Sequence, residues 1–377
     1  MELGLTEEQE LLKKSARDFL STECPKELIR EMDASDEGYS PELWQKIADL
    51  GWMGLAFPEK YGGSDCSFID LVILLEEMGF NILPGPFFST IILGGLSILS
   101  GGTEKQKEDI LPRISKGEIK LTMALTEPDF SYDASKINVK ATKQNNEYII
   151  NGTKLFVPDA NVADYILCVA RTAEGSNPQE GITIFLVDAK QPGIECTLLK
   201  TLALDKQTEV IFNNVAVHED SIVGELNKGW HLVQEILEKA AVAKCAEMVG
   251  GAQAALDMAV AYAKERVQFN RPIGSFQAIQ HYCSNMLTDV EGSRYITYEA
   301  GWKVSEGLPA ACEVSMAKSW VNDAYQRVTL LAHQIFGAMG FTMEHDLHLY
   351  YRRAKAGAQA FGDSDFHKEI IARELNL

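Results

Sequence analysis

The sequence predicts an α+β protein in which a small β-domain lies between two helical regions. Three observations support this: apolar residues keep a helical spacing at the start of the chain, polar and apolar residues alternate in the middle, and long helical stripes return afterwards. We therefore divide the 377 residues into an N-terminal helical domain at 1–119, a middle antiparallel β-domain at 120–226 and a C-terminal four-helix bundle at 227–377.

The first region contains a helical stripe that should pack against a core. Thr6 and Gln9 have the spacing of a capping box, which predicts that a helix begins there, and Thr103 begins another. Gly62-Gly63 and Pro84-Gly85-Pro86 interrupt the helices. The stripe consists of Leu5, Leu11, Leu12, Ala16, Phe19 and Leu20.

The middle region carries strand signals. Residues 136–141 alternate polar and apolar side chains, and Asn151-Gly152 stands between two strand-like runs, which predicts a hairpin turn. Further strands are expected at 165–169, 182–187 and 209–212. From Trp230 onward the spacing is helical again, with a stripe of Leu232, Val233, Ile236, Leu237 and Ala240.

Composition excludes several classes of function. The apolar fraction of 46% is enough for a sizeable core, and the formal net charge of -19 argues against nucleic acid or an anionic membrane as the main partner. The seven cysteines are dispersed and form no CxxC pair, which favours a reducing cytoplasm over a disulfide framework or zinc site. The start of the chain has no signal-peptide pattern, and the apolar stretch at 87–99 is too short to span a bilayer.

Six separated segments resemble the acyl-CoA dehydrogenase family, in the family's order and at its spacing. They are Phe57 to Gly63 (P-x-x-Y-G-G), Gly102 to Lys107, Ala124 to Pro128 (A-x-T-E-P), Gly224-Glu225 with Gly229, Glu265 to Gly274 with Phe276-Gln277 (R-x-x-F), and Gln334 to Phe341 (Q-x-x-G-G-x-G). Each segment is a weak signal alone, but together they cover nearly the whole chain.

The resemblance implies an FAD cofactor held at an interface between two chains. Arg266, Phe269, Gln334 and Gly337 would contact the FAD bound mainly by a neighbouring chain, and an Arg fork suits its pyrophosphate. Thr126 and Phe156 would contact the chain's own cofactor. Alternatives remain: Arg266 could form a surface salt bridge with Glu265 or Asp289, Gln334 could be a plain polar helix residue, and Gly337 with Gly340 could mark a tight helix crossing.

The family removes the acyl α-proton with a Glu, and this chain departs from the family at both positions where that Glu occurs. One position is Phe361 and the other is Ala240, which is followed by Ala241. Neither side chain can accept a proton. Of the nearby acids Asp363, Asp365, Glu247 and Glu238, we take Asp363 as the candidate base. Its alternative role is the N-cap of the last helix, and the alternative for Glu247 is a buried or inter-helix salt bridge.

Other changes affect the chain's own substrate site. Tyr132 stands where the family has a Ser that helps to hold the pantetheine arm, and Pro158 replaces a Thr that lies against the flavin. Pro158 offers neither a hydroxyl nor an N–H. The segments that would contact a neighbour's FAD match the family's pattern, whereas the segments of the chain's own substrate site differ from it.

Three hypotheses follow. The first is a site-sharing or non-catalytic subunit of a heterotetrameric acyl-CoA dehydrogenase, with an acyl-CoA substrate and an electron-transferring flavoprotein as acceptor. The second is a self-sufficient homotetramer that uses Asp363, and the third is a flavin-free scaffold of the same fold. His345, His348 and His367 lie near the C-terminus, but without a clear third ligand we expect no metal.

Overall fold

The computed structural model describes residues 4–377. These residues form two compact units. The helical unit comprises the described residues up to Ile29 together with Ser67–Leu83 and Ala241–Leu377, and the sheet unit comprises Arg30–Cys66 and Pro84–Ala240.

The N-terminal region is helical, as expected. The capping box predicted at Thr6 with Gln9 is confirmed, and so is the helix start at Thr103, which also forms a capping box with Gln106. Of the apolar stripe, Ala16 and Leu20 are buried, whereas Leu11 is 68% exposed. The helices are α1 (Glu7–Glu23), α2 (Lys26–Ala34), α3 (Pro41–Asp49), α4 (Phe68–Asn81), a π-helical segment (Phe88–Gly95), α5 (Leu96–Gly101) and α6 (Glu104–Ser115).

The middle region forms one mixed sheet. Its strands are β1 (Leu121–Ala124), β2 (Lys140–Gln144), β3 (Glu147–Pro158), β4 (Tyr165–Arg171), β5 (Ile182–Asp188), β6 (Ile194–Leu199), β7 (Gln207–His218) and β8 (Ile222–Val223). They lie in the order β6-β7-β3-β2-β4-β5-β8, and β1 pairs with β4. The pairing is antiparallel except that β1 and one residue pair of β2 run parallel to β4.

The hairpin turn predicted at Asn151-Gly152 is wrong. β3 runs through both residues, with a register shift against β7 between Ile150 and Gly152. Gly152 has a φ of 141°, which favours glycine and suits a β-bulge. The turn between β2 and β3 instead contains Asn145, whose φ is 57°.

The strand expected over 136–141 begins only at Lys140. The backbone N–H groups of Asn138 and Val139 donate to the carboxylate of Glu127, at 2.9 and 3.1 Å. Because a side chain takes these donors, the preceding residues do not join the sheet.

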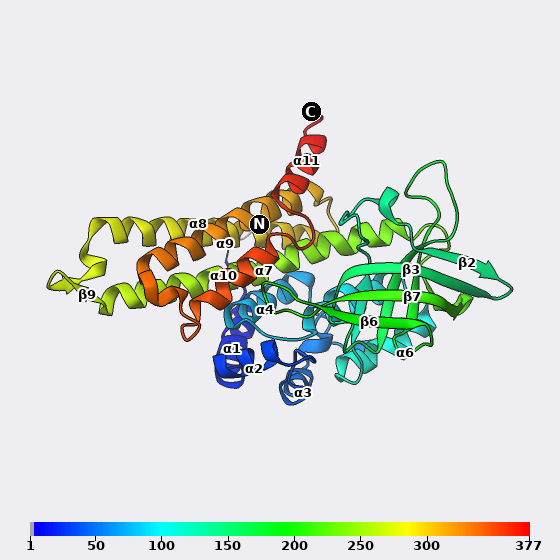
Figure 1. Cartoon of the computed structure of the whole chain (residues 1–377), viewed down its shortest axis with the longest axis horizontal. Helices are drawn as coiled ribbons and strands as arrows, with labels where there is room; N and C mark the ends of the chain where they lie inside the picture. Colours follow the sequence, from blue (N-terminus) through cyan, green and yellow to red (C-terminus); the bar gives the residue numbers. More distant parts are fainter. Residues whose placement is uncertain (1–3) are drawn as a thin grey trace. The chain divides into compact units, whose positions relative to one another are not determined.

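The C-terminal region is helical, with α7 (Trp230–Glu265), α8 (Gln277–Ser305), α9 (Ala311–Phe336), α10 (Leu347–Gly357) and α11 (Ser364–Glu374). A short hairpin of β9 (Val267–Gln268) and β10 (Arg271–Pro272) joins the C-terminal end of α7 to the N-terminal end of α8 (Figure 1). Helical, β and helical regions therefore follow one another as the sequence predicts. Within residues 4–377, no helix is both long and apolar enough to cross a membrane.

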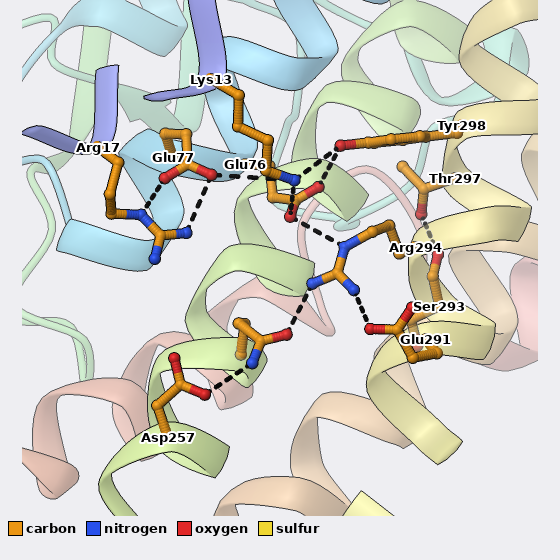
Figure 2. A network of polar contacts seen from close by, with 11 residues as sticks. Lys13, Arg17, Glu76, Glu77, Asp257, Glu291, Ser293, Arg294, Thr297 and Tyr298 are labelled. Carbon is orange, nitrogen blue, oxygen red and sulfur yellow. Dashed lines mark hydrogen bonds and ion pairs between the residues drawn. The ribbon is translucent and has the colours of Figure 1, made fainter. Parts of the chain in front are cut away.

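A buried carboxylate of α4 ties three helices of the helical unit together (Figure 2). Glu76 accepts hydrogen bonds from Lys13 of α1 at 2.9 Å, and from Arg294 and Tyr298 of α8 at 3.0 and 2.7 Å. Burial raises the pKa of Glu76, but Lys13 and Arg294 outweigh it, so the net pKa is lowered. Its neighbour Glu77 pairs with Arg17. These contacts fix α1 and α8 against α4.

Candidate flavin site

The two signature segments of the helical unit meet at one end of α7 and α9. Tyr262 of α7 stacks on Phe336 of α9 with the ring centroids 4.4 Å apart, and its hydroxyl donates to the Sδ atom of Met339 at 3.8 Å. Arg266 follows Tyr262 by one helical turn, and Gln334 precedes Phe336 by two residues. The stack therefore places Arg266 and Gln334 at the same end of the helical unit, although 68 positions separate them in the chain.

Arg266 and Gln334 offer uncommitted donors. Both are exposed, and within residues 4–377 neither side chain has a hydrogen bond or ion pair. The alternative salt bridge from Arg266 to Asp289 is wrong, because Asp289 accepts from Arg327 at 2.7 and 3.0 Å. An exposed guanidinium and an exposed amide at the same end of the helical unit suit an anionic, polar ligand such as a dinucleotide pyrophosphate.

The two glycines that follow Gln334 have different roles. Gly337 has a φ of 62° and a ψ of -138°, and nothing lies within 4 Å of a Cβ added there, so the backbone is open to a ligand. At Gly340, an added Cβ would lie 3.0 Å from Phe336 Cβ and 3.2 Å from Leu347 Cδ2. Gly340 is therefore packed tightly between the end of α9 and the start of α10, while Gly337 leaves room for a ligand.

Near Arg266 and Gln334 in the chain, several apolar side chains face solvent in the single chain. Phe269, at the tip of the β9–β10 hairpin, is 87% exposed, and its ring meets Phe276 edge-on at 6.0 Å. Met339 and Phe341 are 51% and 73% exposed. Exposed apolar groups around a binding site favour cover by another chain.

The candidate cofactor residues of the sheet unit also lie together. The N–H of Leu155 donates to the carbonyl of Thr126 at 2.9 Å, which sets β3 beside the segment after β1. Phe156 is 44% exposed with a φ of 52°, and its ring lies 5.3 Å from that of Phe130, which is 62% exposed. Tyr132, the candidate substrate residue, is half-buried in the loop that follows.

A buried ion pair that the sequence analysis missed anchors this segment. Lys154 Nζ donates to the Glu127 carboxylate at 2.7 Å and to the Leu125 carbonyl at 2.9 Å, and the side chains of Lys154 and Glu127 are 0% and 5% exposed. Burial lowers the pKa of Lys154, although nearby Cys168 and Glu127 favour its charged form. The signal in the sequence is a lysine at an inward-facing position of a strand.

Ala240 and Phe361, the two residues expected at the positions of the base, carry no proton acceptor. Ala240 is fully buried in α7. Phe361 is half-buried in the turn between α10 and α11, with a φ of 58°. A side chain in this left-handed region is uncommon outside glycine and indicates that the surrounding structure holds it there.

The nearby acids have structural partners. The Asp363 carboxylate accepts from the N–H of Phe366 at 2.9 Å, which confirms its role as the N-cap of α11. Glu247 pairs with Lys244 one turn before it in α7, and both side chains are partly exposed, so the buried or inter-helix salt bridge expected there is wrong. Asp365 is exposed and accepts from Lys368 at 3.2 Å.

Removing the cap should weaken the protein measurably. We expect Asp363→Ala to lower the free energy of unfolding by about 1 kcal/mol, and Asp363→Asn to change it much less, because Asn caps helices as well as Asp does. Urea denaturation of both variants checks this, with Asp365→Ala as the control in the same turn. Equal losses for Asp363→Ala and Asp365→Ala would show that the cap contributes nothing specific.

The three C-terminal histidines contact different partners. His345 Nδ1 accepts from the N–H of Leu347, His348 lies 3.2 Å from the Met343 carbonyl, and His367 lies 2.9 Å from the Phe361 carbonyl. Within residues 4–377, no group of three or more His, Cys, Asp or Glu side chains is placed to hold a metal ion.

Comparison with known proteins assigns the family. Three domain families match in order: acyl-CoA dehydrogenase N-terminal domain at residues 6–118, middle domain at 122–215 and C-terminal domain at 227–376. The chain is 35% identical to a 3-(aryl)acrylate reductase of Clostridium sporogenes, over 98% of this chain and 99% of the relative. It is 31% identical to the caffeyl-CoA reductase-Etf complex subunit CarC of Acetobacterium woodii, over 98% of both chains.

Solved structures give the same result. The fold matches butyryl-CoA dehydrogenase from Megasphaera elsdenii with a TM-score of 0.93, at 29% identity and full coverage of both chains. A chain of the ChsE4-ChsE5 complex from Mycobacterium tuberculosis matches with 0.91 at 28% identity, over 100% and 99% of the two chains. The FAD complex of PigA matches with 0.92 at 25% identity and full coverage of both chains. The chain therefore belongs to the acyl-CoA dehydrogenase family of flavoproteins, which are oxidoreductases acting on the CH–CH bond of acyl-CoA thioesters.

Proposed function

We propose that this chain is the site-sharing subunit of a heteromeric acyl-CoA dehydrogenase, in which it contributes FAD contacts to a homologous neighbour but lacks a base of its own. The observation that carries the proposal is a contrast within the chain. Arg266 and Gln334 are kept, exposed and uncommitted, whereas Phe361 and Ala240 occupy the positions of the base. This contrast is explained if Arg266 and Gln334 bind the FAD of a neighbouring chain, and if the chemistry takes place in the neighbour's site rather than in this chain's own.

The residues of this chain fit a flavin dinucleotide held between two chains. Arg266 would place its fork on the pyrophosphate, Gln334 would donate to the same region, and Gly337 would allow close backbone approach. The exposed Phe269 ring would gain cover from the neighbour. When bound, FAD supplies the hydride acceptor of the family's reaction. The proton from the α-carbon must go to a carboxylate, and in this proposal that carboxylate belongs to the neighbour.

The comparisons support a multi-chain assembly. One similar structure is a ChsE4-ChsE5 complex, and one similar relative is a subunit of a reductase-Etf complex. We infer a heterotetramer with a homologous subunit and an electron-transferring flavoprotein as acceptor. The dispersed cysteines, all of them free thiols, agree with a cytoplasmic location. The homotetramer using Asp363 and the flavin-free scaffold remain the competing proposals.

A second candidate is the reverse reaction, hydrogenation of an aryl-substituted α,β-unsaturated thioester. The exposed Phe130 and Phe156 rings favour a substrate with a flat ring, and two relatives are named for aryl acrylate and caffeyl-CoA reduction. Assays of the assembled complex separate the two candidates: butanoyl-CoA is oxidised with an artificial two-electron acceptor, and cinnamoyl-CoA is reduced with a reduced viologen as electron donor.

Flavin retention tests the shared site directly. In the complex co-expressed with its homologous partner, Arg266→Ala should weaken FAD binding by about 1.5–3 kcal/mol, or roughly 10–150-fold in Kd, because a charge-assisted contact to phosphate is lost. Visible absorbance after gel filtration and titration of the apo-complex with FAD measure this. Arg113→Ala, an exposed arginine of α6 in the sheet unit, is the matched control. Unchanged FAD affinity in Arg266→Ala would remove Arg266 from the site.

A further inference from the structure

The turn between α10 and α11 rests on a fully buried lysine. Lys318 of α9 has no exposed side-chain surface, and its ammonium donates to Asn322 Oδ1 at 2.5 Å, the Gly357 carbonyl at 2.9 Å and the Gly362 carbonyl at 3.2 Å. An ammonium has three protons, and all three find an oxygen here. Since a buried charge is unfavourable unless it is satisfied, the two carbonyls that flank the turn are part of a built site.

A buried histidine holds the same turn from the other side. His367 of α11 is 3% exposed, with Nε2 2.9 Å from the Phe361 carbonyl and Nδ1 3.2 Å from the Ser315 hydroxyl. Because a carbonyl can only accept, Nε2 carries the proton, and the neutral ring then accepts from Ser315 at Nδ1.

The backbone of this turn needs such support. Phe361 and Gly362 are consecutive residues with positive φ, at 58° and 101°. A Cβ added at Gly362 would lie 2.7 Å from His367 Nε2, so the turn packs directly on the histidine. A phenylalanine in the left-handed region persists only where other contacts over-determine its conformation.

We propose that Lys318 and His367 are positioning residues that lock this turn, so that Phe361 stays at the position of the base and Asp363 stays at its capping position. This inference rests on the proposed function only where it equates Phe361 with the base. The self-sufficient alternative needs the turn to move so that Asp363 reaches the substrate. The lock opposes that movement from both sides, through the carbonyls of Phe361 and Gly362.

Titration gives the lock a signature. Burial lowers the pKa of His367 to about 4, with the charge of Lys318 also lowering it and the Phe361 carbonyl and Asp363 opposing. An opened turn would return the ring to its ordinary value of about 6.5. His367 then binds its proton more tightly in the open turn than in the closed turn. The closed turn therefore loses stability relative to the open turn as pH falls from 6.5 toward 4. Burial also lowers the pKa of Lys318 to about 8, with Lys244, Cys245 and Asp363 nearby, so its own titration falls outside that window.

Hydrogen exchange of the full chain tests the lock without flavin or turnover, so its outcome is independent of the heteromer test. With intrinsic exchange rates corrected, lowering the pH from 7 to 5 should raise the population of the open turn (residues 358–364) by about 20-fold in the wild type. His367→Gln keeps an Nε2 donor but does not titrate, so its turn should stay protected at pH 7 and lose this pH dependence. His367→Leu and Lys318→Met should open roughly 10–100-fold more often at pH 7.

Lys14→Met, which removes an exposed lysine of α1 in the same unit, is the control and should leave exchange of the turn unchanged. The lock is overturned if the wild-type turn shows no dependence on pH between 7 and 5, or if it exchanges at unprotected rates at pH 7. These two results need no variant, so a variant that fails to fold does not prevent the decision. Equal exchange in His367→Gln and His367→Leu would likewise remove the histidine from the proposal.

Discussion

Purified alone and loaded with FAD, the chain should oxidise acyl-CoA about 10²–10⁴-fold more slowly than the complex with its homologous partner, because a positioned general base contributes a factor of that size. Phe361 cannot take the α-proton, and Ala240 is a buried alanine. Single-turnover reduction of the flavin by butanoyl-CoA, and steady-state turnover with an artificial acceptor, measure the difference.

Asp363→Asn is the discriminating variant for this prediction. Asn keeps the N-cap that the Asp363 carboxylate forms with the N–H of Phe366, so any loss of rate reflects lost proton acceptance rather than an unfolded helix. In our proposal the variant behaves as the wild type, both alone and in the complex. Robust turnover by the lone wild-type chain that disappears in Asp363→Asn, with flavin still bound, would establish Asp363 as the base and refute the heteromer.

The largest effect on stability is expected from Lys154→Met, which should lower the free energy of unfolding by about 3–5 kcal/mol. The substitution leaves the buried carboxylate of Glu127 without its cation at 2.7 Å, inside a sheet where water cannot replace it. Guanidinium or urea denaturation, followed by far-ultraviolet circular dichroism, measures the loss.

The double variant Glu127→Gln with Lys154→Met is the control for the buried pair. The glutamine carbonyl can still accept from the N–H of Val139, although its NH2 group replaces the oxygen that accepted from Asn138. No unpaired charge remains, so part of the lost stability should return. A loss in the double variant as large as in Lys154→Met would show that the pair matters through packing rather than charge. Since Thr126 and Phe156 flank this pair in the chain, the single variant should also loosen the candidate cofactor segment.

Some parts of the candidate site can be predicted from residue types alone. The proposed loss of the base at Phe361 and Ala240, and of a flavin contact at Pro158, needs no coordinates and stays a prediction. The role of Glu127 was not predicted, because its partner Lys154 lies 27 positions away and only tertiary folding brings the two together. Lys318 and His367 were likewise missed as a pair: each looks unremarkable in a helical pattern, and only their shared turn shows what they do.

The sequence by itself determined the order of helical, β and helical regions, the helix starts at Thr6 and Thr103, and the family. These features depend on side-chain period and on capping, which act between residues a few positions apart. Only the tertiary structure decided that Asn151-Gly152 forms a bulge within β3 and that Arg266 has no ion-pair partner in the described chain, since Asp289 binds Arg327. The reason is physical: pairing and burial depend on which distant groups compete for the same donor or acceptor, and local spacing does not carry that information.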